Sequence, residues 1–202
     1  MNKEHFAYFI LVLTTIFWSG NFIVGKAASF YQIPPFSLNF YRWFFAGIIL
    51  LPFTFKELIL KKEYIKKNIL LFIILGVTSI TIFNSFVYYS LYYTQVITGL
   101  LMISTIPVWI ILISSFLKIE KTNIYQIIGV IFSLLGVVAI ITKIDIDIIK
   151  SLDFNKGDLS MIVATFAWAI YSSLLKKSKY EISQITLLQI VIFCGLIFLI
   201  PF

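Results

Sequence analysis

The chain is a succession of long apolar runs separated by short polar stretches. Each run is close to the roughly 20 residues that a helix needs to cross a hydrocarbon core of about 30 Å. Seven such runs are present, at residues 6–24, 36–55, 68–90, 96–117, 124–141, 159–175 and 183–202. The pattern therefore predicts an all-α, polytopic membrane protein with seven transmembrane helices. The first run exceeds the apolar core of about 7 to 15 residues found in signal peptides, so we expect it to remain as the first helix.

Composition supports a membrane protein and changes how the charge is interpreted. Hydrophobic residues make up 60% of the sequence, charged residues 12%, and the mean hydropathy is +1.01, values outside the range of soluble globular domains. The net charge of +7 would suit a nucleic-acid partner only if the basic residues formed one exposed face. They are instead divided between the loops on the two sides of the membrane.

The division of lysines between the two sides is unequal. The side that holds the N-terminus carries eleven: Lys3, Lys56, Lys61, Lys62, Lys66, Lys67, Lys118, Lys121, Lys176, Lys177 and Lys179. The other side carries four, which are Lys26, Lys143, Lys150 and Lys156. This asymmetry follows the positive-inside rule and requires no nucleic acid. It predicts a multi-pass protein of a bacterial-type inner membrane, with a cytoplasmic N-terminus and, after seven crossings, an outside C-terminus.

An acidic stretch divides the chain into two similar parts. Four of the nine carboxylates lie between the fifth and sixth helices, at Asp145, Asp147, Asp153 and Asp158. We interpret them as a solvated segment and residues 144–156 as an outer linker.

The two parts share a pattern of residues. Trp18 and Trp168 are 150 residues apart, as are Lys26 and Lys176, and FAGIILLPF at 45–53 matches FCGLIFLIPF at 193–202. Five helices separate the copies, so the second copy enters the membrane from the opposite side. This predicts an inverted repeat, with one repeat at residues 1–143 and a partial second repeat at residues 157–202.

Arg42 is the only charged residue inside the seven predicted helices. A charge at that depth costs about 2.5 to 3.5 kcal/mol on insertion scales, so it normally faces the bundle interior or a water-filled cavity. Its long stem could instead reach the outer interface as an anchor. We favour a cavity role, beside Asn21, Asn39 and Asn84, in which the guanidinium holds a carboxylate or another anionic group. Asn39 shares its helix face, and none of the predicted helices supplies a carboxylate to neutralise it.

Polar and aromatic side chains line single faces of other predicted helices. The candidate solute-pathway residues are Trp18, Asn21, Asn39, Arg42, Asn84, Tyr88, Trp168 and Tyr171. For Asn21 and Asn84, an interhelical hydrogen bond worth about 0.6 kcal/mol is an equally good interpretation. Tyr89, Tyr92 and Tyr93 are better interpreted as an interfacial aromatic belt.

Two further features concern helix geometry. Pro107 removes a backbone donor inside the fourth helix and predicts a kink, with Ser104 and Thr105 placed to satisfy freed carbonyls. Gly129, Ser133 and Gly136 form a small-residue stripe on the fifth helix, which favours close helix packing.

The chemistry of an enzyme or a metal centre is not apparent in the sequence. His5 is the single histidine and Cys194 the single cysteine, so a zinc site has no ligand set and we expect no cofactor. The carboxylates lie in loops or near the ends of helices, away from any second acid, base or nucleophile in the membrane. We therefore expect a protein that is not an enzyme.

Several of these residues, taken in order, resemble an EamA repeat of the drug/metabolite transporter superfamily. They are FWSGNFIVGK at 17–26, a proline that opens the second helix, Arg42, Pro107, Glu120 and the stripe from Gly129 to Gly136. NKGDLSMIVATFAWAIYS at 155–172 is similar to the start of that family's second repeat, with Gly157, Asp158 and Trp168 at matching places. The resemblance implies a fold of ten helices in two inverted five-helix repeats.

The resemblance also implies a function. It implies transmembrane transport of a small metabolite or an amino-acid-like solute by alternating access, often as export, with the lipid bilayer as surroundings. Since the chain holds one full repeat and two helices of the next, an alternative is open. The chain is then a non-transporting truncated product, or a half-size subunit that a homo-oligomer or the missing C-terminal helices must complete.

Overall fold

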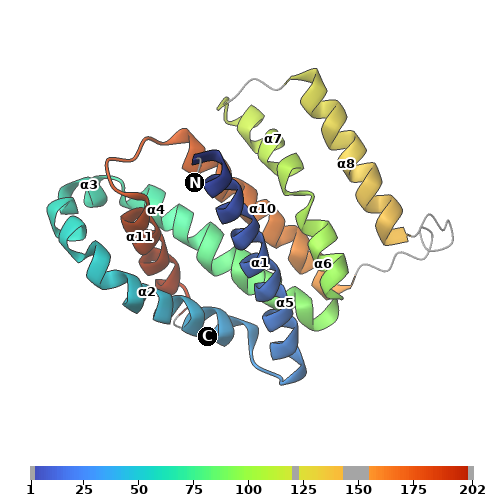
Figure 1. Ribbon diagram of the computed structural model, residues 1–202, viewed down its shortest axis with the longest axis horizontal. Helices are drawn as coiled ribbons and strands as arrows, with labels where there is room; N and C mark the ends of the chain where they lie inside the picture. The colour runs from blue at the N-terminus through green and yellow to red at the C-terminus, as the bar shows by residue number, and fades with distance from the viewer. Residues whose placement is uncertain (1–2, 120–122, 143–154, 200–202) are drawn as a thin grey trace.

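The computed structural model describes residues 3–119, 123–142 and 155–199, and all regular structure within these ranges is helical (Figure 1). The described helices are α1 (Lys3–Phe30), α2 (Pro35–Leu60), α3 (Lys62–Lys67), α4 (Ile69–Gly76), η1 (Val77–Phe83), α5 (Asn84–Tyr93), α6 (Val96–Ile103), α7 (Ile106–Phe116), α8 (Ile124–Thr142), α10 (Lys156–Lys177) and α11 (Gln184–Ile197). The prediction of an all-α fold is confirmed.

Five described stretches are long and apolar enough to cross a membrane. They are Glu4–Phe30, Pro35–Leu60, Ile69–Tyr93, Val96–Phe116 and Lys156–Lys177. The fifth and seventh predicted segments are described as shorter apolar helices, Ile124–Gly136 and Gln184–Ile197. A polytopic membrane protein is therefore confirmed, with five spans of full length and two shorter apolar helices in the described ranges.

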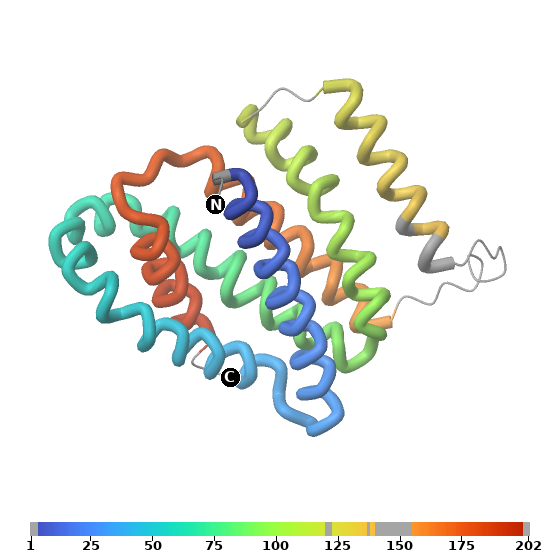
Figure 2. The backbone as a smooth tube through the Cα atoms, in the orientation of Figure 1, coloured from blue at the N-terminus to red at the C-terminus, as the bar shows by residue number. Residues whose placement is uncertain are grey.

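The third span is the centre of the bundle. α4, η1 and α5 follow one another without a break and run between the other helices (Figure 2). This span packs against α1, α2, α10 and α11. Two groups of buried side chains result, one around Phe72 and Ile192 and the other around Tyr88 and Met161.

Close backbone contact joins the third span to α11. A Cβ atom added to Gly76 would lie 2.7 Å from the backbone nitrogen of Gly195. A Cβ atom on Gly195 would lie 2.5 Å from Cβ of Ile80. Only glycine fits at either position, because real Cβ atoms need more than 3.0 Å. The Thr81 hydroxyl then donates to the Gly195 carbonyl at 2.8 Å, within η1, the π-helical part of the span.

α1 and α10, the helices that begin the two predicted repeats, run in opposite directions (Figure 2). Their tryptophans meet edge to face, with the ring centroids of Trp18 and Trp168 5.8 Å apart. α2 and α11, the next pair, also pack against each other. This arrangement has the antiparallel order expected of an inverted repeat, although the boundaries of the two repeats stay a prediction.

Pro107 divides the fourth span. α6 ends at Ile103, α7 starts at Ile106, and Pro107 occupies the first turn of α7, where its missing N–H is not needed. The hydroxyls of Ser104 and Thr105 donate to the carbonyls of Leu101 and Met102, both at 2.6 Å. The polar side chains thus satisfy carbonyls next to the break, as their position beside Pro107 suggests.

α8 lies at one edge of the bundle beside α6 and α7 (Figure 1). Gly129 and Ser133 border a cavity of about 190 Å³ that Pro107 and Val108 also line. Nothing lies within 4 Å of a Cβ atom added to Gly129 or Gly136. The close backbone approach expected for this stripe is therefore not made within the described part of the chain.

The start of α10 corrects one interpretation. Asp158 was expected in a solvated linker, but it forms a capping box with Asn155 at the first turn of α10. The Thr94 hydroxyl donates to both, at 2.9 Å to Asp158 and 3.1 Å to Asn155. A negatively charged oxygen next to the free N–H groups at the start of a helix is stabilised by the positive end of the helix dipole. Asp145, Asp147 and Asp153 lie outside the described residues.

A second contact of this kind ties α2 to α11. The Glu57 carboxylate accepts hydrogen bonds from the backbone N–H of Ser183 at 2.8 Å and from its hydroxyl at 2.5 Å. It also accepts one from the Thr186 hydroxyl at 2.6 Å. Ser183 is the N-cap of α11, so the carboxylate lies at the positive end of that helix.

Candidate solute pocket

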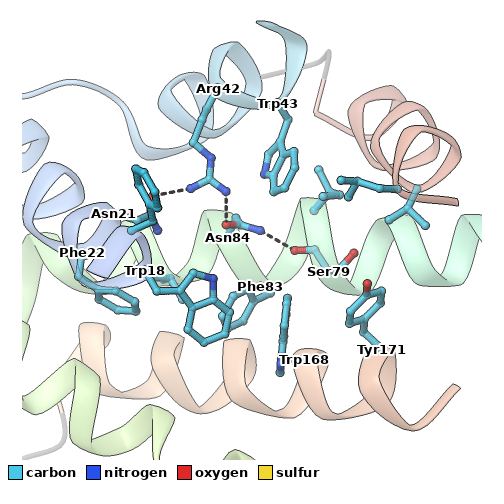
Figure 3. Close-up of a pocket in the computed structure, with 15 residues that line it drawn as sticks. Trp18, Asn21, Phe22, Arg42, Trp43, Ser79, Phe83, Asn84, Trp168 and Tyr171 are labelled. Carbon is cyan, nitrogen blue, oxygen red and sulfur yellow. Dashed lines mark hydrogen bonds between the residues drawn. The ribbon is translucent and has the colours of Figure 1, made fainter. Parts of the chain in front are cut away.

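A cavity of about 340 Å³ lies between α1, α2, the third span, α10 and α11 (Figure 3). Its wall is mainly aromatic, from Phe17, Trp18, Phe22, Trp43, Phe83, Trp168 and Tyr171. Four polar residues, Asn21, Arg42, Ser79 and Asn84, also line it. This volume is at the lower end of the range of about 300 to 1,000 Å³ that is usual for small-molecule sites.

Arg42 is the centre of the polar part. Its Nη1 donates hydrogen bonds to Asn21 Oδ1 and to the Tyr88 hydroxyl, and its Nη2 donates to Asn84 Oδ1 at 2.8 Å. The Tyr88 hydroxyl donates in turn to Asn21 Oδ1 at 2.6 Å. We refer to Asn21, Arg42, Asn84 and Tyr88 as the Arg42 cluster. The guanidinium thus points into the bundle and not toward an interface, so the anchor interpretation does not fit the geometry.

The third span supplies two members of the Arg42 cluster from its buried part. Tyr88 is 2% exposed and Asn84 6%. Asn84 comes directly after η1, and its Nδ2 donates to the Ser79 carbonyl at 2.7 Å. This bond uses the amide nitrogen, so the amide oxygen is directed at Arg42. π-helical segments occur often at functional sites, and here one sets the direction of a polar side chain.

Trp43 covers one face of the guanidinium. The central carbon of the Arg42 guanidinium lies 4.7 Å from the centroid of the Trp43 ring, a distance suited to a cation–π contact. The indole Nε1 of Trp43 is buried and has no hydrogen-bond partner in the described ranges. The wall of the cavity thus includes a buried polar group that the described protein groups leave unsatisfied.

The aromatic side opposite Arg42 comes from α10 (Figure 3). Trp168 packs on Phe83 with ring centroids 4.4 Å apart and on Tyr171 at 5.0 Å. Trp18 completes this side through its contact with Trp168. The cavity therefore has one polar end at Arg42 and one aromatic end at Trp168.

Most of the candidate pathway residues come together here. Trp18, Asn21, Arg42, Asn84, Trp168 and Tyr171 line the cavity, and Tyr88 is bonded to Arg42 and Asn21. Asn39 lies elsewhere. It is fully buried, and its Nδ2 donates at 2.8 Å both to the Ile80 carbonyl and to the Ser85 hydroxyl. It therefore helps to join α2 to the third span and does not reach the cavity.

Nine lining residues are not among the candidates from the sequence, and three of these nine lie close to Arg42 or Asn84 in the chain. Trp43 directly follows Arg42, Phe83 precedes Asn84, and Ser79 lies one turn earlier. Side chains at adjacent positions of a helix point about 100° apart. The sequence therefore gives no reason to place the Trp43 ring beside Arg42, or the Phe83 ring beside Asn84. It also carries no signal that separates these two aromatic residues from lipid-facing ones.

Metal binding finds no support in the described ranges. No group of three or more His, Cys, Asp or Glu residues in them is placed to hold a metal ion. Arg42 is the only charged residue among the described residues that line the cavity.

Comparison with known proteins gives a family but no characterised activity. The EamA-like transporter family matches residues 5–142. An uncharacterized transporter of Archaeoglobus fulgidus is 31% identical over 100% of this chain and 68% of its own length. The uncharacterized transporter YyaM of Bacillus subtilis is 29% identical over 83% of this chain and 54% of its own length.

An uncharacterized transporter of Clostridium kluyveri is 31% identical over 84% of this chain and 56% of its own length. The matches to the last two relatives thus cover little more than half of those proteins. No solved structure matches. The match over residues 5–142, together with the similarity to the Archaeoglobus protein, establishes that the chain belongs to the EamA-like transporter family.

Proposed function

We propose that this protein moves a small solute across a bacterial-type cell membrane by alternating access, in the direction of export, and that the cavity at the Arg42 cluster is its binding site. The observation that carries the proposal is a charged, hydrogen-bonded cluster in a cavity between apolar helices. A charge in a membrane helix is costly and normally marks a solute or ion pathway. Membership of the family supports transport as the general activity, and the cavity supports a site for the solute at the Arg42 cluster.

The position of the cavity supports an alternating-access mechanism. Its walls come both from α1, α2 and the third span of the first predicted repeat, residues 1–143, and from α10 and α11 of the second, residues 157–202. Transporters built from inverted repeats bind their solute at the interface between repeats and expose it to each side in turn. Relative motion of the two groups of helices would change access to Arg42.

The lysine distribution supports a cytoplasmic N-terminus. α3 and the connection from α10 to α11 lie at the same end of the bundle (Figure 1). α3 and the residues next to it carry Lys61, Lys62, Lys66 and Lys67, and the connection carries Lys179. Reporter fusions at Lys62 and Lys156 test this orientation. A cytoplasmic signal at Lys62 and an external one at Lys156 are expected, and the reverse would overturn it.

The second candidate function is that of a half-size subunit whose pathway a partner completes, and one observation favours it. Phe17 and Trp18 line the cavity yet are 70% and 48% exposed, so α1 leaves one side of the cavity open in this chain. A half-size subunit would close that side with a second copy or another chain. Measuring the oligomeric state in lipid nanodiscs, with Trp18 as a cross-linking position, separates a monomer from such an assembly.

The transport proposal is tested with the gene at its native locus. Cells with and without the gene are compared for the efflux of a metabolite panel, measured by mass spectrometry in the medium. We expect a small set of solutes to leave wild-type cells faster and to be retained after deletion. Restoration by the wild-type gene and not by Asn84→Ala is the expected control. Identical efflux profiles with and without the gene would contradict the proposal.

A further inference from the structure

The described polar side chains of the cavity have more free hydrogen-bond donors than free acceptors. A guanidinium has five N–H donors and no acceptor. Three of these donors are directed at Asn21, Tyr88 and Asn84. The Nε–H and one Nη2–H are therefore left without a partner in the described part of the chain. Nη1 is fully used, so a ligand must approach the side of the guanidinium formed by Nε and Nη2.

Trp43 carries one further donor without a partner among the described residues. The buried Nε1–H of Trp43 has no partner in the described ranges, and the Trp43 ring lies against the guanidinium. The acceptor oxygens of the Arg42 cluster are already in use, because Asn21 Oδ1, Asn84 Oδ1 and the Tyr88 hydroxyl all accept from Arg42. The polar end of the cavity thus has N–H groups to offer and few free acceptors.

Charge adds a second constraint. In the described part of the chain, no Asp or Glu lines the cavity, and Arg42 is the only cation that does so. A solute amine would meet the positive guanidinium with no carboxylate to balance it, which is unfavourable in a region of low dielectric constant. A solute with two negative charges would have only one positive partner. A single negative charge matches the site.

The rest of the cavity selects for an apolar body. Trp18, Phe83 and Trp168 form its other end, and their ring contacts leave mainly aromatic surface facing the space. Aromatic side chains favour offset or edge-to-face contacts with another ring. At about 340 Å³ the cavity accommodates a small molecule.

We propose, building on the transport function above, that the solute is a small monocarboxylate with an apolar, preferably aromatic, body. Its carboxylate binds the Nε and Nη2 side of Arg42 as a bidentate pair, and one of its oxygens accepts from Trp43 Nε1–H. Its body lies against Trp18 and Trp168. The planar fork of arginine matches a carboxylate better than the single ammonium of lysine does.

Four probes that share one apolar body test this solute class. The probes are 3-phenylpropionate, its neutral amide, 3-phenylpropylamine and 2-phenylethyl phosphate, and their binding to the purified full chain in nanodiscs is measured by calorimetry. We expect 3-phenylpropionate to bind at least about tenfold more tightly than each of the other three, since only it supplies one planar anionic group. Equal binding of the amide, or tighter binding of the amine or the phosphate, would overturn the proposal.

Two variants locate the binding site of the carboxylate. Arg42→Lys keeps the charge but removes the fork, and we expect it to lose most of the preference for the carboxylate over the amide. Trp43→Phe keeps a ring and removes the N–H, and we expect a loss of about three- to tenfold for the carboxylate alone, the range of one net hydrogen bond. Trp109→Phe is the matched control, because Trp109 packs on Phe166 and is not among the lining residues. Unchanged preference in both Arg42→Lys and Trp43→Phe would overturn the proposed pose.

The solute class and the transport function fail in different ways. If the carboxylate does not bind while the efflux assay still identifies a solute of another class, the class is wrong and the transport function stands. If the carboxylate binds as expected and efflux of monocarboxylates is the same with and without the gene, the transport function is wrong and the binding site stands.

Discussion

Two helix faces rich in small residues behave in opposite ways in this protein. Gly76 and Gly195 bring the third span and α11 into backbone contact, with no room for a Cβ atom on either. Gly129 and Gly136 on α8 face open space within the described chain. Small residues permit a close helix approach, but they do not create one. The difference lies in the partner helix. Gly76 on the third span and Gly195 on α11 lie against each other, so both helices have a small residue at the point of contact.

The largest effect is expected at the tight face. Gly195→Ala places a methyl group 2.5 Å from Cβ of Ile80 and 2.8 Å from the Gly76 carbonyl oxygen. Both obstacles belong to the third span, so α11 must move away from it. We expect a loss of about 3 kcal/mol in the free energy of unfolding, at the upper end of the usual cost of overpacking. Denaturation in mixed detergent measures it, and a change below about 1 kcal/mol would contradict the tight contact.

A smaller effect is expected where Glu57 ties α2 to the start of α11. Glu57→Gln removes the charge that accepts from Ser183 and Thr186. We expect a loss of about 1 kcal/mol, because the site is half-exposed and the bonds to a charged acceptor are partly replaced by water. Thermal unfolding of the purified chain measures the effect.

Glu63→Gln is the matched control for Glu57. Glu63 forms a pair with Lys66 at 3.6 Å in which both side chains are about three quarters exposed, and exposed pairs contribute little. We expect no measurable change in this variant. If the two variants behave alike, the contact between Glu57 and α11 has no special role in holding the second predicted repeat.

The smallest effect is expected at the open face of α8. Gly129→Ala and Gly136→Ala meet no atom within 4 Å, and alanine is the better helix former. We expect each to be neutral or stabilising by less than about 1 kcal/mol in the same denaturation experiment. A large loss on substitution would show that this face packs closely against something outside the described chain. The two faces would then both be closely packed, and they would differ only in the partner that each packs against.

The sequence predicts the Arg42 cluster better than the cavity around it. Asn21, Arg42, Asn84 and Tyr88 are conspicuous because polar side chains are costly in apolar helices. Trp43 and Phe83 are common residue types in such helices, so nothing in their identity separates a lining ring from a lipid-facing one.

Asn39 illustrates why the sequence does not predict which polar side chains reach the cavity. It lies three residues before Arg42, and the helical spacing placed both on one face. Its actual partner is the Ile80 carbonyl in the π-helical segment η1. Thr81 in the same segment donates to the carbonyl of Gly195, which is 114 residues away in the chain. Tertiary contacts of this range leave no local signal, and they decide which polar residue reaches the cavity.

The overall fold can be predicted from the sequence more fully than the cavity can. Apolar runs of bilayer length predicted all the spans in order, and the break at Pro107 follows from its missing N–H. Asp158 was misinterpreted because its loop holds other carboxylates, while the Asn155 cap three residues earlier was the local signal for a helix start.

The most direct test of the account is the transport rate of Arg42→Lys at equal membrane expression, measured with 3-phenylpropionate or with the solute identified by the efflux comparison. Lysine keeps a positive charge at the same position and can anchor a helix equally well, but it lacks the planar fork. We predict normal expression and a loss of about tenfold or more in transport, with Arg42→Ala at least as impaired. Transport at the wild-type rate in Arg42→Lys would contradict recognition of the solute by Arg42.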